Sequence, residues 1–543
     1  MQPSTLAKRV WLLLFIAILA FYLYGLGHMP LVGPDEPRYA QVAREMFLRR
    51  DLITPTLGGH TWFEKPVLLY WLMMFGYKVF GVSEFSARLG PALAGVLAII
   101  AVWWISRRIE TKSSLPHFSF LSVLVMASSG GMVVFSRGAS FDIVVTMTLT
   151  WALGFFLAYE LESERRAWYL AGFYFFIGLS LLAKGLIGIV LPFGIVILFY
   201  ILRRRWPEKK LFVSLIWGVP LALVVASLWY GPVIYRHGWP FINEFFIQHH
   251  FARYFSNKYQ HPQPFYYYLP IILMLSIPWT IFLIEGLVKS KDWSWRSDDL
   301  TSKTRVFAFA WLIMPILFFS CSGSKLPAYI LPSLAAAAFL VGERLSIFIS
   351  KAEAVLISMR VTIALSLILA LGVLIYAQQT HRASLLCAAL VIAPVVLFGG
   401  LILLRSSKRL LSTVSLALIP VSVSILALNC AVDRIASRES VRELINRADR
   451  QGYSKAPLVM FSRIERSSEF YAAGRVIYGA DGDPLKVENP EEVIAQVKNA
   501  NGSLLLIVPM GSLPRLERIP GIEAKLLADN GRNGVVAVST KPN

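Results

Sequence analysis

Two acidic residues, Asp35 and Glu36, stand directly before Pro37 in a polar stretch that follows the first apolar segment. Because proline is favoured in the first turn of a helix, the pair lies at a predicted helix start. A carboxylate there could accept the proton of an acceptor hydroxyl as a general base. Acidic residues also stabilise helix N-termini, and for Glu36 we favour this capping interpretation. Asp35 is therefore the candidate catalytic residue of this stretch.

A second acidic residue, Glu64, is followed by Lys65 and Pro66 at the head of an aromatic-rich helix predicted from the sequence. A lysine at this position could bind a phosphate, and the N-terminus of the helix helps to hold an anion. An interfacial helix with Trp, Tyr and Lys among lipid headgroups is an equally good interpretation. The two interpretations are compatible with each other.

The stretch from Phe245 to Tyr254 contains His249, His250 and Arg253. His250 and Arg253 are three residues apart, so on a helix they share a face. Arg253 could bind a phosphate, and His250 could bind a divalent ion together with Glu64 through nitrogen and oxygen. Histidines also occur on interfacial helices as plain amphipathic residues, so metal binding is one of two interpretations.

The elements that position these residues are predicted to be membrane-spanning helices. Of 543 residues, 56% are hydrophobic and 16% charged, and 53 Lys and Arg against 33 Asp and Glu leave a net charge of +20. This composition excludes a disordered basic chain and argues against a soluble nucleic-acid-binding protein. Apolar runs of spanning length recur and predict a polytopic α-helical membrane protein with roughly thirteen transmembrane helices. They lie at 10–26, 88–106, 117–135, 143–159, 167–183, 185–202, 211–230, 266–287, 306–320, 328–342, 354–377, 384–404 and 411–430.

Charged residues at the joints between these runs form a further group of candidates. The run 167–202 is interrupted only at Lys184-Gly185. As one helix it would be roughly 50 Å long, which exceeds the ~30 Å hydrocarbon core, so we predict a hairpin with Lys184 at its tip. The same argument places Asp142 at a second tip, and Lys325 and Tyr329 at a third. A lysine at the end of a span often only extends its ammonium group to the lipid headgroup region. Several such residues together on one face, however, indicate a site for an anionic lipid headgroup.

The distribution of basic residues predicts the orientation. Most Lys and Arg lie in one set of short loops, which faces the cytoplasm by the positive-inside rule, so most of the net charge records topology. The N-terminus is then cytoplasmic, and residues 1–432 form a transmembrane domain with outer loops 28–87 and 231–264. Residues 433–543 are predicted to form a small α/β soluble domain on the outer side. Its predicted strands are 457–461, 475–478, 504–508 and 535–538, and its predicted helices are 440–451 and 490–500.

Five motifs in this order resemble those of the C-type integral-membrane glycosyltransferases. The family includes the protein O-mannosyltransferases and, closer still, the bacterial aminoarabinose transferases of lipid A. The resemblance covers nearly the whole chain. The motifs are Asp35 to Ala40, Phe63 to Pro66, Ala183 to Gly185, His250 with Arg253, and Ser324 to Pro332.

The resemblance implies an undecaprenyl phosphate donor carrying 4-amino-4-deoxy-L-arabinose and transfer to lipid A phosphate on the periplasmic face of the bacterial inner membrane. It implies catalytic roles for Asp35 and Asp142 and a divalent metal ion bound by Glu64 with His250 or His249. This chain has Gln248-His249-His250 where a Glu-His pair is expected, so either histidine is a candidate ligand. The resemblance assigns Lys65, Arg253 and Tyr329 to the donor phosphate, and we add Lys325 and Lys184 as cations at the hairpin tips.

The reaction requires mainly positioning and charge from the protein. Lys65, Arg253 and Lys325 would stabilise the charge that grows on the leaving lipid phosphate. A phosphate acceptor is already an anion and needs no strong base, whereas a protein hydroxyl does. The first alternative is therefore the same transfer to protein hydroxyls or another envelope glycan. A lipid transporter or flippase is an alternative class, but it predicts charges near the bilayer midplane and paired repeats, whereas the candidate residues lie at span ends.

Overall fold

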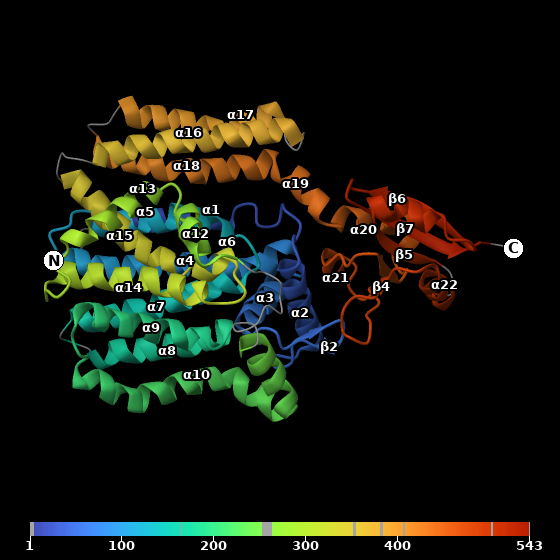
Figure 1. Ribbon diagram of the computed structural model, residues 1–543, viewed down its shortest axis with the longest axis horizontal. Helices are drawn as coiled ribbons and strands as arrows, with labels where there is room; N and C mark the ends of the chain where they lie inside the picture. The colour runs from blue at the N-terminus through green and yellow to red at the C-terminus, as the bar shows by residue number, and fades with distance from the viewer. Residues whose placement is uncertain are drawn as a thin grey trace. The chain divides into compact units, whose positions relative to one another are not determined.

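The structure is a computed structural model that describes residues 5–162, 164, 166–251, 263–350, 355–380, 384–404, 408–500 and 503–541 (Figure 1). Its contacts divide the chain into two compact units, which are described separately. The first, here the helical unit, comprises Met1–Tyr24, Phe63–Leu69 and Arg88–Ala427. The second, here the mixed unit, comprises Gly25–Trp62, Tyr70–Ala87 and Leu428–Asn543.

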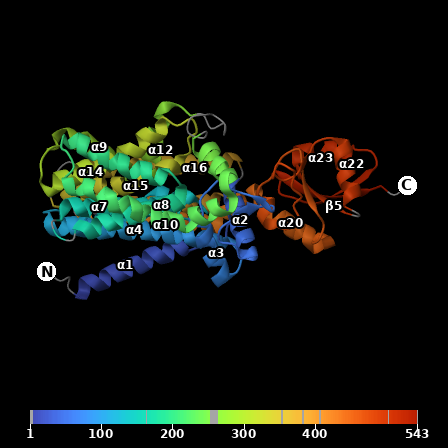
Figure 2. The same cartoon turned by 90° about the horizontal axis from the view of Figure 1, so that it is seen from below.

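Long helices lying side by side make up the helical unit (Figures 1 and 2). Apolar runs form helices in a membrane because a helix satisfies its own backbone hydrogen bonds without water. The first part of the unit contains α1 (Thr5–Leu23), α4 (Glu84–Lys112), α5 (Phe118–Ser128), α6 (Gly130–Phe135), α7 (Phe141–Leu161), α8 (Arg166–Lys184), α9 (Ile187–Arg203), α10 (Lys209–Ile242) and the π-helix η1 (Asn243–Phe251). The second part contains η2 (Phe265–Tyr267), α12 (Tyr268–Leu275), α13 (Thr280–Val288), η3 (Lys289–Asp292), α14 (Leu300–Ser320), η4 (Pro327–Ile330), α15 (Ser333–Ser350), α16 (Val355–Thr380), α17 (Leu385–Leu404) and α18 (Arg409–Cys430).

Within the described residues, nine helices are long and apolar enough to cross a membrane, or ten if one bent pair counts as a span. Three shorter apolar helices, α3 (Leu68–Phe80), α5 and α9, fall below that length. The predicted multi-pass helical fold is therefore confirmed. Each of the predicted apolar runs contains a helix, while the number of thirteen crossings stays a prediction.

Two runs that the sequence predicts as single spans are broken. The run 117–135 is interrupted at Ser129, and the run 266–287 bends by 120° between α12 and α13, where Pro278 cannot continue the helix. Polar groups of the two breaks form hydrogen bonds with each other. The Gly130 N–H donates to the Ile277 carbonyl over 2.8 Å, and Trp279 Nε1 donates to Ser128 Oγ over 3.0 Å. Irregular backbone is tolerated inside an apolar body when protein groups pair it in this way.

The predicted hairpin at Lys184 is confirmed. Helix α8 ends at Lys184, and Gly185 turns the chain with a φ of 71° before α9 begins. A Cβ at Gly188 would lie 2.5 Å from the backbone carbon of Ser180, so only glycine permits this approach of α9 to α8. The other two predicted tips also fall between helices, at 136–140 before α7 and at 321–332 between α14 and α15.

The mixed unit is built around a five-stranded sheet with the order β4-β3-β5-β7-β6. Strand β3 pairs in parallel with β4 and β5, whereas β7 pairs antiparallel with β5 and β6. The strands are β3 (Leu458–Phe461), β4 (Lys486–Val487), β5 (Leu504–Pro509), β6 (Ile522–Asp529) and β7 (Asn533–Thr540). The other elements are α2 (Asp35–Arg49), β1 (Thr56–Leu57), β2 (His60–Thr61), α3 from Tyr70 onward, α19 (Val432–Glu439), α20 (Arg442–Ala448), η5 (Asp449–Tyr453), α21 (Ser467–Tyr471), α22 (Pro490–Asn499), η6 (Met510–Ser512) and α23 (Leu513–Glu517).

Both faces of this sheet are covered, which confirms the small α/β domain. Alternate strand residues point to opposite faces. Val459 and Leu506 pack on one side with Val493 of α22, and Met460 packs on the other with Leu444 of α20. The prediction of a strand at 475–478 was wrong, since only isolated bridges form there, and β6 was missed because an edge strand needs few apolar residues.

Helix α2 from the stretch 28–87 packs on α21 within the mixed unit. The Leu31 N–H donates to Tyr471 Oη over 2.7 Å, and Arg44 Nη1 donates to the Phe470 carbonyl over 3.2 Å. Helix α2, which begins with Asp35, therefore shares a folding unit with the C-terminal sheet.

We predict that Trp279→Phe destabilises the helical unit by about 1 kcal/mol more than Trp311→Phe, because only the first removes a made hydrogen bond. Both indoles are fully buried, but Trp311 Nε1 has no hydrogen-bond partner among the described residues. Unfolding by detergent titration measures the difference. Equal losses in the two variants would show that the paired breaks add no stability.

Candidate functional site

Asp142, Lys184 and Tyr329 come together from three hairpin tips and are here called the tip cluster. Asp142 lies in the first turn of α7, where Ser140 Oγ accepts a hydrogen bond from its N–H over 3.1 Å. Lys184 is the last residue of α8, and its ammonium forms an ion pair with the Asp142 carboxylate. The same ammonium lies 4.4 Å from the ring centroid of Tyr329 in η4. Three of the residues predicted from the sequence are therefore neighbours.

The local electrostatics favour this arrangement. A carboxylate at a helix N-terminus and an ammonium at a helix C-terminus each interact well with the helix dipole. The side chains are 17% and 14% exposed for Asp142 and Lys184, so the pair is largely shielded but reachable. An ammonium fixed by a carboxylate and an aromatic ring is a preorganised contact for an anion. Asp142 thus serves first to hold Lys184 in position.

The third tip is stabilised by its own hydrogen bonds. Lys325 is 7% exposed, and its ammonium donates to the Ser322 carbonyl over 2.7 Å. Tyr268 Oη donates to the Leu326 carbonyl over 3.2 Å, and the Tyr329 ring lies 5.0 Å from that of Phe319. Lys325 therefore braces the loop that presents Tyr329 to Lys184.

Glu64 and Lys65 form a second ion pair of the helical unit, with 2.8 Å between Nζ and Oε1. Their side chains are 10% and 15% exposed. The preceding residue, Phe63, donates its N–H to Glu244 Oε1 over 3.2 Å and packs its ring against Phe241. This segment therefore contacts η1, which carries His249 and His250.

The predicted metal ligands and the predicted arginine are only partly covered by the structure. The side chain of His250 and all of Arg253 lie outside the described residues. No group of three His, Cys, Asp or Glu side chains that could hold a metal occurs in the described part of the chain. The Glu64 carboxylate forms an ion pair with Lys65. The divalent ion therefore stays a prediction, and no step proposed below uses one.

Asp35 begins helix α2 in the mixed unit and is held by Arg38. Arg38 Nη2 lies 2.5 Å from Asp35 Oδ1, and Arg38 Nε donates to the Pro34 carbonyl over 2.8 Å. The guanidinium also lies 5.3 Å from the Trp62 ring. The Asp35 side chain is 49% exposed, so its carboxylate has one fixed orientation and an open side. Glu36, by contrast, is buried and accepts the Val32 N–H over 3.1 Å, which agrees with its predicted structural role.

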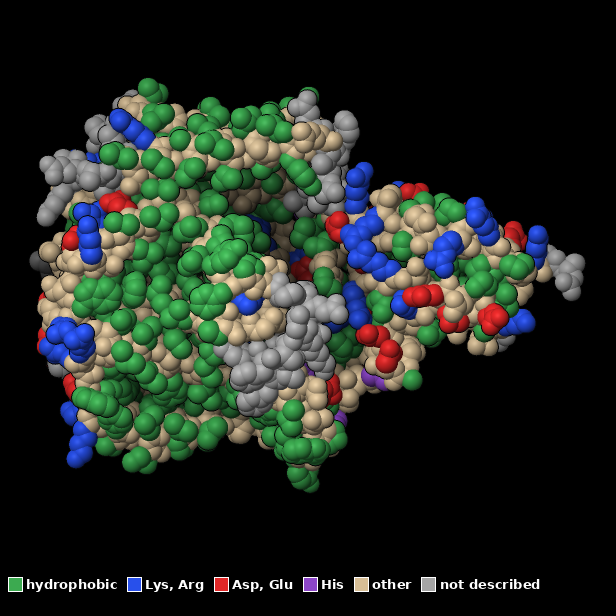
Figure 3. All heavy atoms as spheres, viewed as in Figure 1, with side chains coloured by type: hydrophobic (Ala, Val, Ile, Leu, Met, Phe, Trp, Pro, Cys, Tyr) green, Lys and Arg blue, Asp and Glu red, His purple; other side chains and the backbone are tan. Residues whose placement is uncertain are grey.

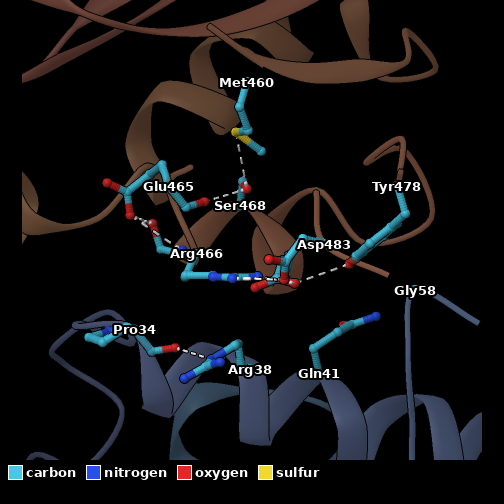
Figure 4. A network of polar contacts seen from close by, with 12 residues as sticks. Pro34, Arg38, Gln41, Gly58, Met460, Glu465, Arg466, Ser468, Tyr478 and Asp483 are labelled. Atoms are coloured by element: carbon cyan, nitrogen blue, oxygen red, sulfur yellow. Dashed lines mark hydrogen bonds and ion pairs between the residues drawn. The ribbon is translucent and has the colours of Figure 1, made fainter. Parts of the chain in front are cut away.

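Sequence reasoning missed a group of polar residues next to α2. Figure 4 shows Arg38 and Gln41 of α2 beside the segment that carries Arg466, with Arg38 hydrogen-bonded to the Pro34 carbonyl. Arg466 Nη1 lies 3.6 Å from Glu469 Oε1, and Arg466 Nη2 donates to Asp483 Oδ1 over 2.8 Å. Burial raises the pKa of the Glu469 carboxyl to about 7, against the opposing charges of Arg466 and Arg38. No local pattern connects positions so far apart in the sequence, so only the tertiary structure reveals this group.

The chain is similar to proteins that are already known. The family model of dolichyl-phosphate-mannose-protein mannosyltransferases matches residues 64–230, a range that includes Lys65, Asp142 and Lys184. The chain is 32% identical over 338 residues to an undecaprenyl phosphate-alpha-4-amino-4-deoxy-L-arabinose arabinosyl transferase of Edwardsiella ictaluri, covering 61% of this chain and 58% of that protein. It is 32% identical over 379 residues to the Pseudomonas paraeruginosa protein of the same name, covering 68% and 66%. The chain thus matches about three fifths of the length of these curated relatives.

A solved structure extends the likeness to the whole fold. The crystal structure of ArnT from Cupriavidus metallidurans bound to undecaprenyl phosphate matches with a TM-score of 0.81 at 23% identity, covering 97% of this chain and 98% of that one. The chain therefore has the fold of the C-type integral-membrane glycosyltransferases, as its motifs indicated. Within that class its sequence is similar to the undecaprenyl phosphate-aminoarabinose arabinosyl transferases.

The raised pKa of Glu469 predicts a pH-dependent stability. A carboxyl whose pKa is about 7 in the folded state and 4.5 ordinarily binds its proton more tightly when folded. The contribution of the protonated Glu469 carboxyl to the free energy of unfolding is complete below pH 4.5 and is lost as the pH rises toward 7. We predict that wild type loses up to about 3 kcal/mol relative to Glu469→Gln across this window, since glutamine mimics the protonated acid. Thermal unfolding of the two proteins at several pH values measures this difference.

Glu443→Gln is the matched control, because the Glu443 side chain is 49% exposed in the same unit. Its unfolding midpoint should run parallel to wild type between pH 4.5 and 7. A Glu469→Gln curve that also stays parallel would contradict the assignment.

Proposed function

We propose that this chain transfers 4-amino-4-deoxy-L-arabinose from undecaprenyl phosphate to a phosphate of lipid A. The observation that carries the proposal is the tip cluster, in which a lysine ammonium is held by a carboxylate and a tyrosine ring at one end of the helical unit. Lys65 adds a second largely shielded cation on a segment that packs against the end of α10. The sequence likeness to aminoarabinose transferases and the fold of ArnT support the choice of donor.

The proposed reaction breaks the bond between the anomeric carbon and the donor phosphate oxygen. Negative charge grows on that phosphate as it leaves, and the Lys65 and Lys184 ammonium groups stabilise it. Asp142 keeps Lys184 in place before the reaction, so little reorganisation is needed when the charge develops. Arg253, which the family resemblance assigns to the same phosphate, would add a bidentate contact.

Asp35 is the proposed residue on the acceptor side of the reaction. A lipid A phosphate attacks through an oxygen that already carries negative charge, so the reaction needs orientation more than proton removal. The Asp35 carboxylate is suited to orient a cationic or hydroxyl group, since Arg38 fixes one of its oxygens and its side chain is half exposed. With a protein hydroxyl as acceptor, the same carboxylate would act as general base.

The proposed setting is a bacterial inner membrane with the tip cluster on the periplasmic side. The basic loops gather at one end of the helical unit, as the blue side chains at the left of Figure 3 illustrate. By the positive-inside rule that end is cytoplasmic. The N-terminus would then be cytoplasmic, and the domain after α18 would be periplasmic.

A transporter function is disfavoured by the composition of the two helix breaks. Transporters commonly place charged or ion-coordinating groups at broken helices near the midplane. The breaks at 128–130 and 276–279 contain serine, glycine, isoleucine, proline and tryptophan, which pair with one another. The charged candidate residues lie at helix ends instead.

We predict that Lys65→Met and Asp35→Asn each lower sugar transfer by about a hundredfold, because each removes charge stabilisation or orientation in the transition state. Purified protein in liposomes, supplied with the undecaprenyl phosphate sugar and lipid A, gives the rate by mass spectrometry. Lys209→Met, which changes an exposed lysine at the start of α10, is the control and should stay within about twofold of wild type. Near wild-type turnover in both test variants would refute the proposal.

A strain that lacks this protein tests the identity of the acceptor independently of the transfer chemistry. Loss of the aminoarabinose adduct on lipid A is the expected result in the mass spectrum. Unchanged lipid A together with altered glycoproteins or another altered envelope glycan would instead support the alternative acceptor.

A further inference from the structure

A pocket of about 780 Å³ lies at the basic end of the helical unit, where α9 ends beside the loop between α13 and α14. Its lining includes Ile201 and Arg204 from the end of α9, and Ser294, Trp295 and Arg296 from the loop. Helix α9 begins next to the tip cluster and ends here, so this pocket is separate from the proposed donor site.

Arg203 and Arg205 beside the pocket form ion pairs, whereas the two arginines that line it have no partner within the described residues. Arg203 Nη2 lies 2.8 Å from Asp298, and Arg205 also forms an ion pair with that carboxylate. The hydrogen bonds from Arg205 and Arg203 hold the pKa of Asp298 below its usual range. The guanidinium groups of Arg204 and Arg296 have no hydrogen bond or ion pair within the described residues. Two positive charges therefore border the pocket without a recorded counter-charge.

The backbone at Arg204 is also unusual. Arg204 has a φ of 51° and a ψ of 46°, a left-handed conformation that ends α9 and that favours glycine. Keeping a long side chain at such a position costs conformational energy that glycine would avoid. Arg50 has the same conformation at the end of α2, and a cation near a helix C-terminus also interacts well with the helix dipole. Replacing Arg204 by glycine therefore suits the backbone and removes only the side chain.

The rim of the pocket is apolar and resembles a membrane interface. Ile201 is 63% exposed and the nearby Trp206 is 91% exposed. Trp295 donates through Nε1 to the Ser290 carbonyl over 3.0 Å, and its ring lies 5.2 Å from that of Phe309. Tryptophan anchored in this way is typical of the headgroup region of a bilayer. The pocket thus combines cations and hydroxyl groups with a hydrocarbon-compatible edge.

We propose that this pocket binds the phosphate of an anionic phospholipid headgroup through Arg204 and Arg296, with an acyl chain along Ile201. The two unpaired guanidinium groups match the charge of the phosphate. The apolar edge favours a lipid over a free phosphate ion, because a phosphate ion has no hydrocarbon group that could contact it. Basic pockets at helix ends on the cytoplasmic side are known to suit such headgroups. The inference does not depend on the proposed transfer reaction.

The test is binding of phosphatidylglycerol and phosphatidylcholine to the purified full chain, measured by native mass spectrometry. The pocket variant combines Arg204→Gly, which suits the left-handed backbone, with Arg296→Gln. We expect its affinity for phosphatidylglycerol to fall by about tenfold or more, with binding of phosphatidylcholine unchanged. The control, Lys209→Gln with Lys210→Gln, removes the same charge from exposed positions outside the pocket and should change affinity by less than about twofold.

Three results would overturn the proposal. An equal loss in both double variants would mean general attraction to a basic surface, and no loss in the pocket variant would mean that its arginines do not bind the lipid. Displacement of phosphatidylglycerol by millimolar inorganic phosphate would indicate a site for a free anion. If thermal unfolding shows that the pocket variant is misfolded, the single variant Arg204→Gly is used in its place. Its affinity for phosphatidylglycerol is then expected to fall about fivefold.

Discussion

The placement of charge in the helical unit follows from one constraint, the poor solvation of ions by hydrocarbon. A charged group there must lie at a helix end, form an ion pair, or do both. Asp142 and Lys184 do both, at the start of α7 and the end of α8. At the other end of the unit, Arg305 pairs with Glu343 and Arg344 with Glu285. The chemistry of this chain is therefore confined to the ends of its helices, and the helices between them act as an apolar frame.

The hairpin tip at Lys184 was predictable from the sequence because the bilayer limits the length of a span. Lys184 had to lie at a tip, since an uninterrupted helix through it would be too long. The ion pair with Asp142 was not predictable, because the two residues are 42 positions apart and only helix packing determines their contact. The same holds for the paired breaks at Gly130 and Ile277, where an apolar run gives no local sign of interruption.

The mixed unit shows a second limit of sequence reasoning. Asp35 was recognisable as a candidate from its carboxylate and the following Pro37. That its partner Arg38 lies beside the C-terminal segment of Arg466 depends on contacts between parts of the chain separated by more than 400 positions, such as the hydrogen bond from Arg44 to Phe470. A buried acid such as Glu469 looks like any surface glutamate in the sequence. Its raised pKa arises from burial, which only the tertiary structure supplies.

In the proposed function, cations at the hairpin tips recognise a lipid-linked phosphate. The most direct measurement is a binding titration of the purified protein with undecaprenyl phosphate and with undecaprenol, which has the same chain without the phosphate. We predict that undecaprenyl phosphate binds at least about tenfold more tightly than undecaprenol and that Lys184→Met removes most of this difference. Equal affinities for the two lipids in the wild-type protein would contradict it.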